Sequence, residues 1–258
     1  MAAPSLRVVE AGARTYRRTF RASIFSAFVN PALYLVAMGI GLGRLVDTST
    51  SGPSLGLPYL TFLAPGLLAA TAMQIGAGDA SYPVMAGIKW RKSYQAILAT
   101  PITVRDLIVG HLGWVTIRIT LVTAIFAMFM VVFGATSAMQ AATAVPAAML
   151  TGLTFAALVT GYTARLKDES GLAGLFRFGI VPLFLFSGTF FPVEQLPALI
   201  RPIAYVTPLW HGVSLSRGFA LPEVGFVANP VVSIAYLVGL TILGGYFAMR
   251  MFRKRLIL

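Results

Sequence analysis

The sequence predicts an all-α membrane protein with six transmembrane helices, and three observations lead to this class. Of the 258 residues, 57% are hydrophobic and only 11% are charged, whereas a typical soluble domain carries about 25% charged residues. Six apolar runs each approach the ~20 residues that a helix needs to cross a ~30 Å hydrocarbon core. The basic residues concentrate in the short segments between these runs, as in membrane proteins with several spans.

The predicted spans follow one another without a change in composition. They cover approximately residues 23–46, 59–80, 109–133, 141–164, 173–191 and 229–249. The first run is too long for the hydrophobic core of a signal peptide and lacks a cleavage site of small residues, so we expect it to be retained. No linker or internal repeat divides the chain, which predicts a single domain over residues 1–258.

The N-terminal segment, residues 1–22, is polar and rich in arginine. From residue 4 onward, apolar residues recur at spacings of three and four, while the arginines take the other face; the apolar residues are Leu6, Val9, Ala13, Tyr16 and Phe20. This pattern is typical of an amphipathic helix that lies in the head-group region of a membrane. The alternative is a basic tail that only adds positive charge to the cytoplasmic side.

Lysine and arginine are unevenly distributed between the two sides of the predicted membrane. The N-terminal segment, residues 81–106, residues 165–177 and the C-terminus together hold 16 of the 20 basic residues. The opposite side holds Arg44, Arg201 and Arg217. The positive-inside rule therefore places both termini in the cytoplasm, which agrees with an even number of spans. This placement also explains the net charge of +12 without nucleic acid.

The segment 81–106 is the longest predicted cytoplasmic connection. Within it, Ile88–Ala99 has the pattern of a short basic helix with Trp90, Tyr94 and Ile97 on an apolar side. Thr103 and Asp106 have the spacing of a capping box at the start of the third span. A helix that is both basic and apolar is suited to docking a soluble partner. A solvated loop on anionic lipid is the alternative.

The stretch 187–217 is apolar but cannot form a single spanning helix. Pro192, Pro197, Pro202 and Pro208 each remove a backbone donor, and Glu194 adds a charge that is costly at membrane depth. We predict two half-helices, at about 193–204 and 208–218, that dip back into the outer leaflet. Irregular backbone at this depth must pack against protein or line a cavity. An external loop with apolar packing is the alternative.

Two charged residues lie within predicted spans. Asp79 is near the inner end of the second span and Arg118 is inside the third. Since an isolated charge in a membrane is costly, we expect these residues to pair across the two helices. The pair would fix helix packing, or it would form a polar lining for a substrate path.

Several chemistries are excluded or disfavoured. The P-loop motif G-x-x-x-x-G-K-[ST] does not occur, so ATP is not expected to bind this chain through it. The two histidines, His111 and His211, are not part of an H-E-x-x-H motif, and the sequence around Ser214 and Ser216 does not match G-x-S-x-G. We therefore predict no catalytic, cofactor or metal site.

Several segments together match the motifs of a known protein family. The strongest match is Phe186-Ser-Gly-Thr-Phe-Phe-Pro-Val-Glu-Gln-Leu-Pro197 followed by Pro208-Leu-Trp-His211 and Arg217. Weaker matches begin at Asn30, Tyr59 and Ile97. With these motifs the chain resembles the permease subunits of ABC type-2 exporters. It is similar to the branch that contains nodulation lipooligosaccharide exporter permeases and daunorubicin-type drug exporter permeases.

The resemblance implies specific partners and sites. Two permease chains, expected as a homodimer in the bacterial inner membrane, would each bind a separate ATPase subunit that holds ATP and magnesium. The N-terminal helix and the 81–106 coupling loop would contact that ATPase, the loop through Ile88, Lys89, Trp90, Arg91, Tyr94 and Gln95. Some relatives have an acidic residue where this chain has Gln95. The 192–217 hairpin would cap the exit, and its marked residues are Pro192, Glu194, Pro197, Pro208, His211 and Arg217.

The resemblance also implies a function. The expected activity is ATP-driven export of an amphipathic substrate, first a lipid-linked saccharide or lipooligosaccharide and alternatively a drug or antibiotic. An intramembrane enzyme and a membrane scaffold are more distant alternatives from other classes. The sequence lacks a cluster of catalytic residues that would favour the enzyme.

Overall fold

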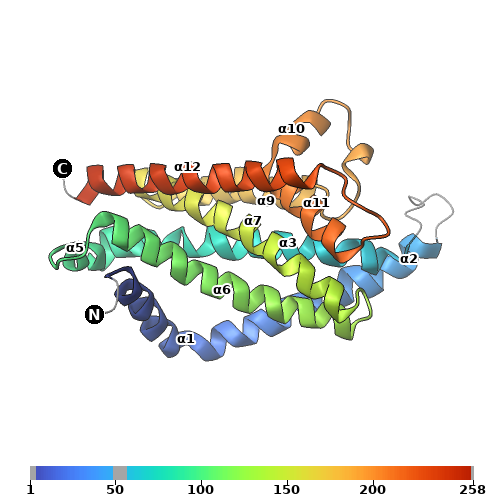
Figure 1. Cartoon of the computed structure of the whole chain (residues 1–258), viewed down its shortest axis with the longest axis horizontal. Coiled ribbons are helices and arrows are strands. Elements are labelled where there is room, and N and C mark those ends of the chain that lie inside the picture. The colour runs from blue at the N-terminus through green and yellow to red at the C-terminus, as the bar shows by residue number, and fades with distance from the viewer. Residues whose placement is uncertain (1–3, 49–56, 257–258) are drawn as a thin grey trace.

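A computed structural model describes residues 4–48 and 57–256, and all secondary structure in this part of the chain is helical. This confirms the predicted all-α class. The helices lie side by side in one elongated bundle (Figure 1). Its elements are α1 (Pro4–Tyr34), η1 (Leu35–Leu42), α2 (Gly43–Thr48), α3 (Tyr59–Asp79), α4 (Tyr82–Met85), η2 (Ala86–Trp90), α5 (Ser93–Leu98), α6 (Val104–Val132), α7 (Ala138–Arg165), α8 (Ser170–Leu175), η3 (Phe176–Ile180), α9 (Val181–Phe186), η4 (Val193–Gln195), α10 (Arg201–Val206), α11 (Pro208–Ala220) and α12 (Pro230–Leu256).

Four helices within the described residues are long and apolar enough to cross a membrane. They are Tyr59–Trp90, Val104–Val132, Ala138–Arg165 and Pro230–Leu256. The predicted fifth span corresponds to a shorter apolar helix, Ser170–Phe186, and the predicted first span falls in α1, η1 and α2. The six-span count therefore stays a prediction.

The N-terminal helix is longer than predicted. It does not end near residue 22 but continues to Tyr34, and Figure 1 shows the ribbon of α1 bending in its middle. Val8 is buried against the bundle, whereas Leu6 of the predicted apolar stripe is 52% exposed. The membrane-facing role of the stripe stays a prediction. The side chains of Phe20 and Arg44 lie outside the described part of the structure.

Glycines set how closely α1 approaches α6. A Cβ atom on Gly110 would lie 2.6 Å from the carbonyl oxygen of Ser5 and from Cβ of Val8. Only glycine permits this contact, since real Cβ atoms do not approach other atoms so closely. The N-terminal part of α1 is therefore docked on the start of α6 as well as being amphipathic.

The centre of the bundle is the crossing of α3 and α7. A Cβ atom on Gly76 would lie 2.1 Å from the carbonyl oxygen of Gly152, and one on Gly152 would lie 2.6 Å from that of Ala72. Small residues of this kind allow membrane helices to approach backbone to backbone. α7 also packs against α6, α11 and α12. α3 is consequently the most buried candidate span among the described residues.

The segment 81–106 contains two short helices where one was predicted. The predicted helix Ile88–Ala99 is wrong as a continuous element, because Lys92 adopts the left-handed conformation with φ of 51° between η2 and α5. No glycine or proline marks this break in the sequence. The predicted capping box is confirmed: the Thr103 hydroxyl accepts from the Asp106 amide, and the Asp106 carboxylate accepts from the Thr103 amide.

The proline-rich hairpin is partly as predicted. Its second half-helix is α11, but the first is broken into η4 and α10, with residues 196–200 between them. Pro202 and Pro208 each lie at the first turn of a helix, where a missing amide costs nothing. α11 is buried against α3 and α7, whereas α10 projects from the bundle (Figure 1).

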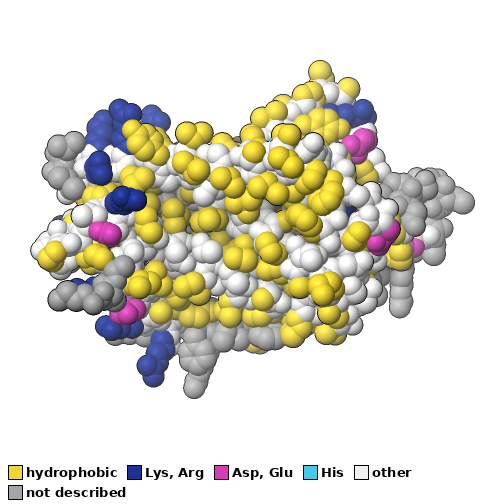
Figure 2. All heavy atoms as spheres, in the orientation of Figure 1, with side chains coloured by type: hydrophobic (Ala, Val, Ile, Leu, Met, Phe, Trp, Pro, Cys, Tyr) yellow, Lys and Arg dark blue, Asp and Glu magenta, His cyan; other side chains and the backbone are white. Residues whose placement is uncertain are grey.

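The two ends of the bundle differ in charge. Figure 1 shows both termini and α5 at the same end, and α2 and α10 at the other. On the face shown in Figure 2, most lysine and arginine side chains lie at the end with the termini, and hydrophobic side chains spread along the flank. At that end Arg255 of α12 donates to the carbonyl oxygen of Ala164 at 2.9 Å, which joins the ends of α12 and α7.

Candidate functional site

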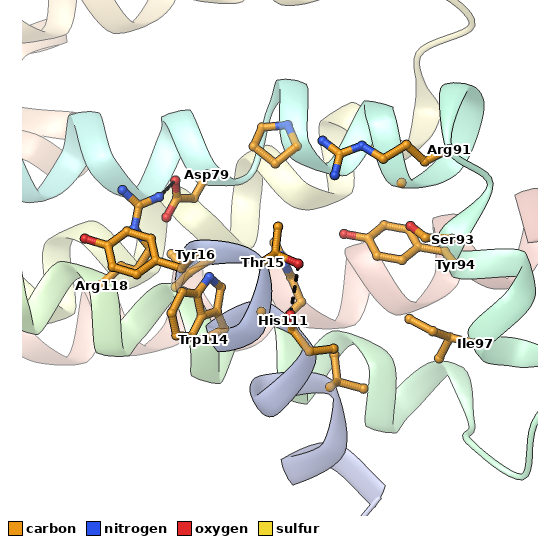
Figure 3. Close-up of a pocket in the computed structure, with 16 residues that line it drawn as sticks. Thr15, Tyr16, Asp79, Arg91, Ser93, Tyr94, Ile97, His111, Trp114 and Arg118 are labelled. Carbon is orange, nitrogen blue, oxygen red and sulfur yellow. Dashed lines mark hydrogen bonds and ion pairs between the residues drawn. The ribbon is translucent and has the colours of Figure 1, made fainter. Parts of the chain in front are cut away.

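A cavity of about 450 Å³ lies between α1, α3, η2, α5 and α6, at the end of the bundle that carries the termini (Figures 1 and 3). Its lining combines charged and aromatic side chains, which are Tyr16, Asp79, Arg91, Tyr94, His111, Trp114 and Arg118. The cavity therefore brings together three predicted features: the N-terminal helix, the 81–106 segment and the intramembrane charges.

Asp79 and Arg118 form an ion pair across α3 and α6. Their side chains are 15% and 22% exposed, so the pair is only partly shielded from the cavity. The Arg118 guanidinium also lies 5.2 Å from the centroid of the Tyr16 ring, which adds a cation–π contact from α1. Oδ2 of Asp79 is buried without a hydrogen-bond partner among the described residues. The two charges thus compensate each other and tie three elements together.

Two aromatic rings of the cavity wall pack on glycines of neighbouring segments. A Cβ atom on Gly12 would lie 2.7 Å from Cγ of Trp114, and one on Gly87 would lie 2.7 Å from Cε2 of Tyr94. Tyr94 also packs against Phe252 of α12, with ring centroids 5.7 Å apart. Burial raises the pKa of the Tyr94 phenol to about 12, so this wall stays uncharged near neutral pH.

The six predicted coupling residues divide into two groups. Lys89, Trp90, Arg91 and Gln95 are exposed, whereas Ile88 is buried and the Tyr94 ring faces the protein. Gln95 Nε2 donates to the carbonyl oxygen of Ile88 at 2.8 Å and so bridges the break at Lys92. The exposed side chains lie at the end of η2, directly after it and on α5, whereas Ile88 belongs to the core.

Arg217 is the buried charge of the predicted exit hairpin. It is 5% exposed, and it donates to the carbonyl oxygens of Phe62 at 3.2 Å and Gly188 at 3.0 Å. Its guanidinium carbon lies 3.8 Å from the centroid of the Phe62 ring. Arg217 therefore joins α11 to α3 and to the irregular backbone after α9.

Glu194 and the three marked prolines of the predicted exit hairpin lie at its surface or at the ends of its short helices. Glu194 is exposed and accepts a hydrogen bond from the Tyr205 hydroxyl at 3.3 Å, and it lines a cavity of about 130 Å³ together with Arg217. Pro192 precedes η4, Pro197 is exposed between η4 and α10, and Pro208 starts α11.

His211 is held inside the bundle. Its Nδ1 lies 3.0 Å from the Ser233 hydroxyl, and its ring packs on Tyr236 with centroids 4.4 Å apart. Within residues 4–48 and 57–256, no three potential ligands from histidine, cysteine, aspartate and glutamate gather as a metal site would require.

Sequence reasoning missed the aromatic wall of the cavity. Trp114 and Tyr16 contact each other edge to face, with centroids 5.6 Å apart. Gly12 and Gly110, which lie on the contacting faces of α1 and α6, are the signal in the sequence that indicates a close approach of these helices.

Comparison with known proteins identifies the family. A family model described as ABC-2 type transporter matches residues 8–221. The chain belongs to the ABC-2 type transporter family. The resemblance found in the sequence is thereby confirmed. Members of this family are membrane subunits of transporters and work with a separate ABC ATPase subunit.

The permease is also similar to several curated relatives. It is 28% identical to Nodulation protein J of Rhizobium meliloti (strain 1021) over 87% of this chain and 81% of the relative. It is 29% identical to Nodulation protein J of Rhizobium leguminosarum bv. viciae over 86% of this chain and 83% of the relative. The protein of the same name from Bradyrhizobium diazoefficiens is 27% identical over 94% of this chain and 90% of the relative. The similarity extends over nearly the whole permease.

Proposed function

We propose that this permease is the transmembrane subunit of an ATP-driven exporter that moves a lipid-linked saccharide or lipooligosaccharide out of the cytoplasm or inner leaflet. The observation that carries the proposal is the similarity to Nodulation protein J over most of both chains. Export of a drug or antibiotic is the alternative, because such a substrate also combines a polar group with apolar surface.

The proposed topology has six spans in one domain, with both termini in the cytoplasm of a bacterium. The shared position of the two termini and α5 at the basic end of the bundle supports it (Figures 1 and 2). Residues 1–22 would begin at the cytoplasmic surface, and residues 192–217 would return into the outer leaflet from the opposite side.

The ATPase would dock on the exposed coupling residues. Trp90 is 52% exposed at the end of η2, next to the basic Lys89 and Arg91. A large exposed aromatic side chain beside charged groups is typical of an interface anchor. We infer two permease chains, as a homodimer, with two ATPase chains that hold ATP and magnesium.

Movement of the ATPase would reach the membrane helices through packed contacts. The Gln95–Ile88 hydrogen bond would couple α5 to η2, and Tyr94 contacts Phe252 of α12. At the other end, the buried α11 and its Arg217 contacts would hold the hairpin that caps the exit. A shift of one permease against the other would then open the path for the substrate.

Reconstitution tests this proposal. The permease and its ATPase are placed in vesicles, and ATP-dependent movement of a labelled lipid-linked saccharide or an amphipathic drug is measured. We expect saccharide transport that Trp90→Ala reduces at least tenfold, while Val109→Ala, an exposed position on α6, has no effect. If only the drug is transported, the saccharide is the wrong substrate and drug export is the function. If neither compound moves in an ATP-dependent way, the proposal is contradicted.

A further inference from the structure

We propose that the cavity between α1, α5 and α6 binds a neutral saccharide of one or two sugar units. The biological role of the site, as the place where the head group of the substrate is held before export, rests on the proposed function. Binding itself rests on the cavity.

The charged side chains of the cavity disfavour a cation and suit a ligand with hydroxyl groups. A cationic group would meet Arg118 and, at the α5 side, Arg91. An anionic group that approached Arg118 would also approach the Asp79 carboxylate. Arg91 lies at the other end of the cavity from Asp79 (Figure 3), so an anionic head group is the competing ligand there. The hydroxyl groups of a saccharide both donate to a carboxylate and accept from a guanidinium.

The aromatic walls suit the apolar faces of sugar rings. Trp114 and Tyr94 both line the cavity, and each is backed by a glycine. Each is also held by a second ring, Trp114 by Tyr16 and Tyr94 by Phe252. Figure 3 shows the ion pair with Tyr16 and Trp114 at one end of the cavity, and Arg91, Tyr94 and Ile97 at the other. Aromatic surface with a few placed polar groups is typical of sites for small organic ligands.

The size of the cavity agrees with this ligand class. Its volume of about 450 Å³ lies in the range of roughly 300–1,000 Å³ of small-molecule sites. One or two sugar units fill such a space, whereas a longer oligosaccharide or an acyl chain would have to extend beyond it. The remainder of an amphipathic substrate would therefore lie outside the cavity.

The fluorescence of Trp114, which lines the cavity, can report ligand binding directly. In a Trp90→Phe, Trp210→Phe background, Trp114 is the one tryptophan left of the three in the sequence. The full-length permease in lipid nanodiscs is titrated with maltose, cellobiose and, separately, phosphoethanolamine, and Trp114 fluorescence is recorded. Ile97→Phe narrows the cavity without touching the ion pair, and Val109→Phe adds the same ring at an exposed position on α6 as the matched control.

We expect a saturable fluorescence change with at least one disaccharide, at least tenfold weaker binding in Ile97→Phe, and unchanged binding in Val109→Phe. A response to phosphoethanolamine alone would assign the cavity to a phospholipid head group and overturn the inference. No response to either disaccharide, or a response that Ile97→Phe leaves unchanged, would also overturn it. Since the assay needs no ATPase, failed transport with intact binding would contradict the proposed function and leave the site in place.

Discussion

Arg118 and Arg217 are both shielded from solvent but are stabilised in different ways. Arg118 has a carboxylate partner, Asp79, and both side chains reach a cavity. Arg217 is almost fully buried, donates to two backbone carbonyl oxygens and stacks on Phe62. The charge of Arg118 is therefore balanced by a charge, and that of Arg217 by backbone dipoles and an aromatic ring.

This difference indicates different tasks. A paired charge beside a cavity keeps a polar surface available to a ligand while the helices stay together. A guanidinium that bridges carbonyl oxygens satisfies irregular backbone, such as that of Gly188 with its φ of 81°, inside the protein. Arg118 thus lines a cavity, whereas Arg217 holds the backbone turn at Gly188 in place.

Replacing Arg217 should have the largest effect. Arg217→Met removes two hydrogen bonds and leaves the carbonyl oxygens of Phe62 and Gly188 without this donor, so we expect a loss of about 3–5 kcal/mol in unfolding free energy. Thermal unfolding of the purified permease measures it. Arg201→Met is the matched control, because Arg201 is less buried and its Nε donates to a single carbonyl, that of Leu196. If both variants lose the same unfolding free energy, Arg217 is no more important for stability than Arg201.

Breaking the ion pair should cost less, because the pair is partly exposed. Asp79→Asn leaves Arg118 without its carboxylate, and we expect a loss of about 1–3 kcal/mol in the same unfolding assay. The double variant Asp79→Asn, Arg118→Gln should recover part of this loss, since no unpaired charge remains. A double variant as unstable as the sum of the two single variants would show that the pair does not act as a unit.

The glycine beneath Trp114 gives a smaller and more local test. Gly12→Ala places a methyl group against the Trp114 ring, so we expect a shifted Trp114 emission and a loss of about 1 kcal/mol despite the better helix propensity of alanine. Gly113→Ala is the control on α6, where the new Cβ would lie 3.5 Å from Val9. We expect this control to be neutral or slightly stabilising. A neutral Gly12→Ala with unchanged emission would contradict the close packing of α1 on Trp114.

The smallest effect is expected at Glu194. Its carboxylate is exposed and lines the cavity that Arg217 also reaches, but the two form no ion pair. Glu194→Gln should therefore change the unfolding free energy by less than about 0.5 kcal/mol. A loss of unfolding free energy comparable to that of Asp79→Asn would mean that Arg217 also depends on an acidic partner. The contrast between Arg118 and Arg217 would then disappear.

The sequence predicted the contact between charged side chains more readily than the contacts with backbone groups and the breaks in helices. A lone aspartate and a lone arginine in apolar runs indicate a partner, and Asp79 and Arg118 are in contact in the structure. The carbonyl partners of Arg217 could not be predicted, because Phe62 is 155 residues away and every residue carries a carbonyl group. The break at Lys92 was equally hidden, since a left-handed lysine has no compositional signal.

The N-terminal helix shows a second limit. Its periodicity indicated the correct element type but not which residues contact α6. These contacts involve Gly12 and Val8, and a search for hydrophobic residues does not detect a glycine that permits close packing. The contact of Trp114 with α1 was missed for the same reason.

The most direct test of the exporter architecture is native mass spectrometry of the detergent-purified permease, co-expressed with the proposed ABC ATPase partner. The account predicts a complex of two 27.5 kDa permease chains with two ATPase chains. It also predicts that Trp90→Ala, Lys89→Glu releases the ATPase and leaves the permease pair intact. A permease that binds no ATPase under these conditions would contradict the account.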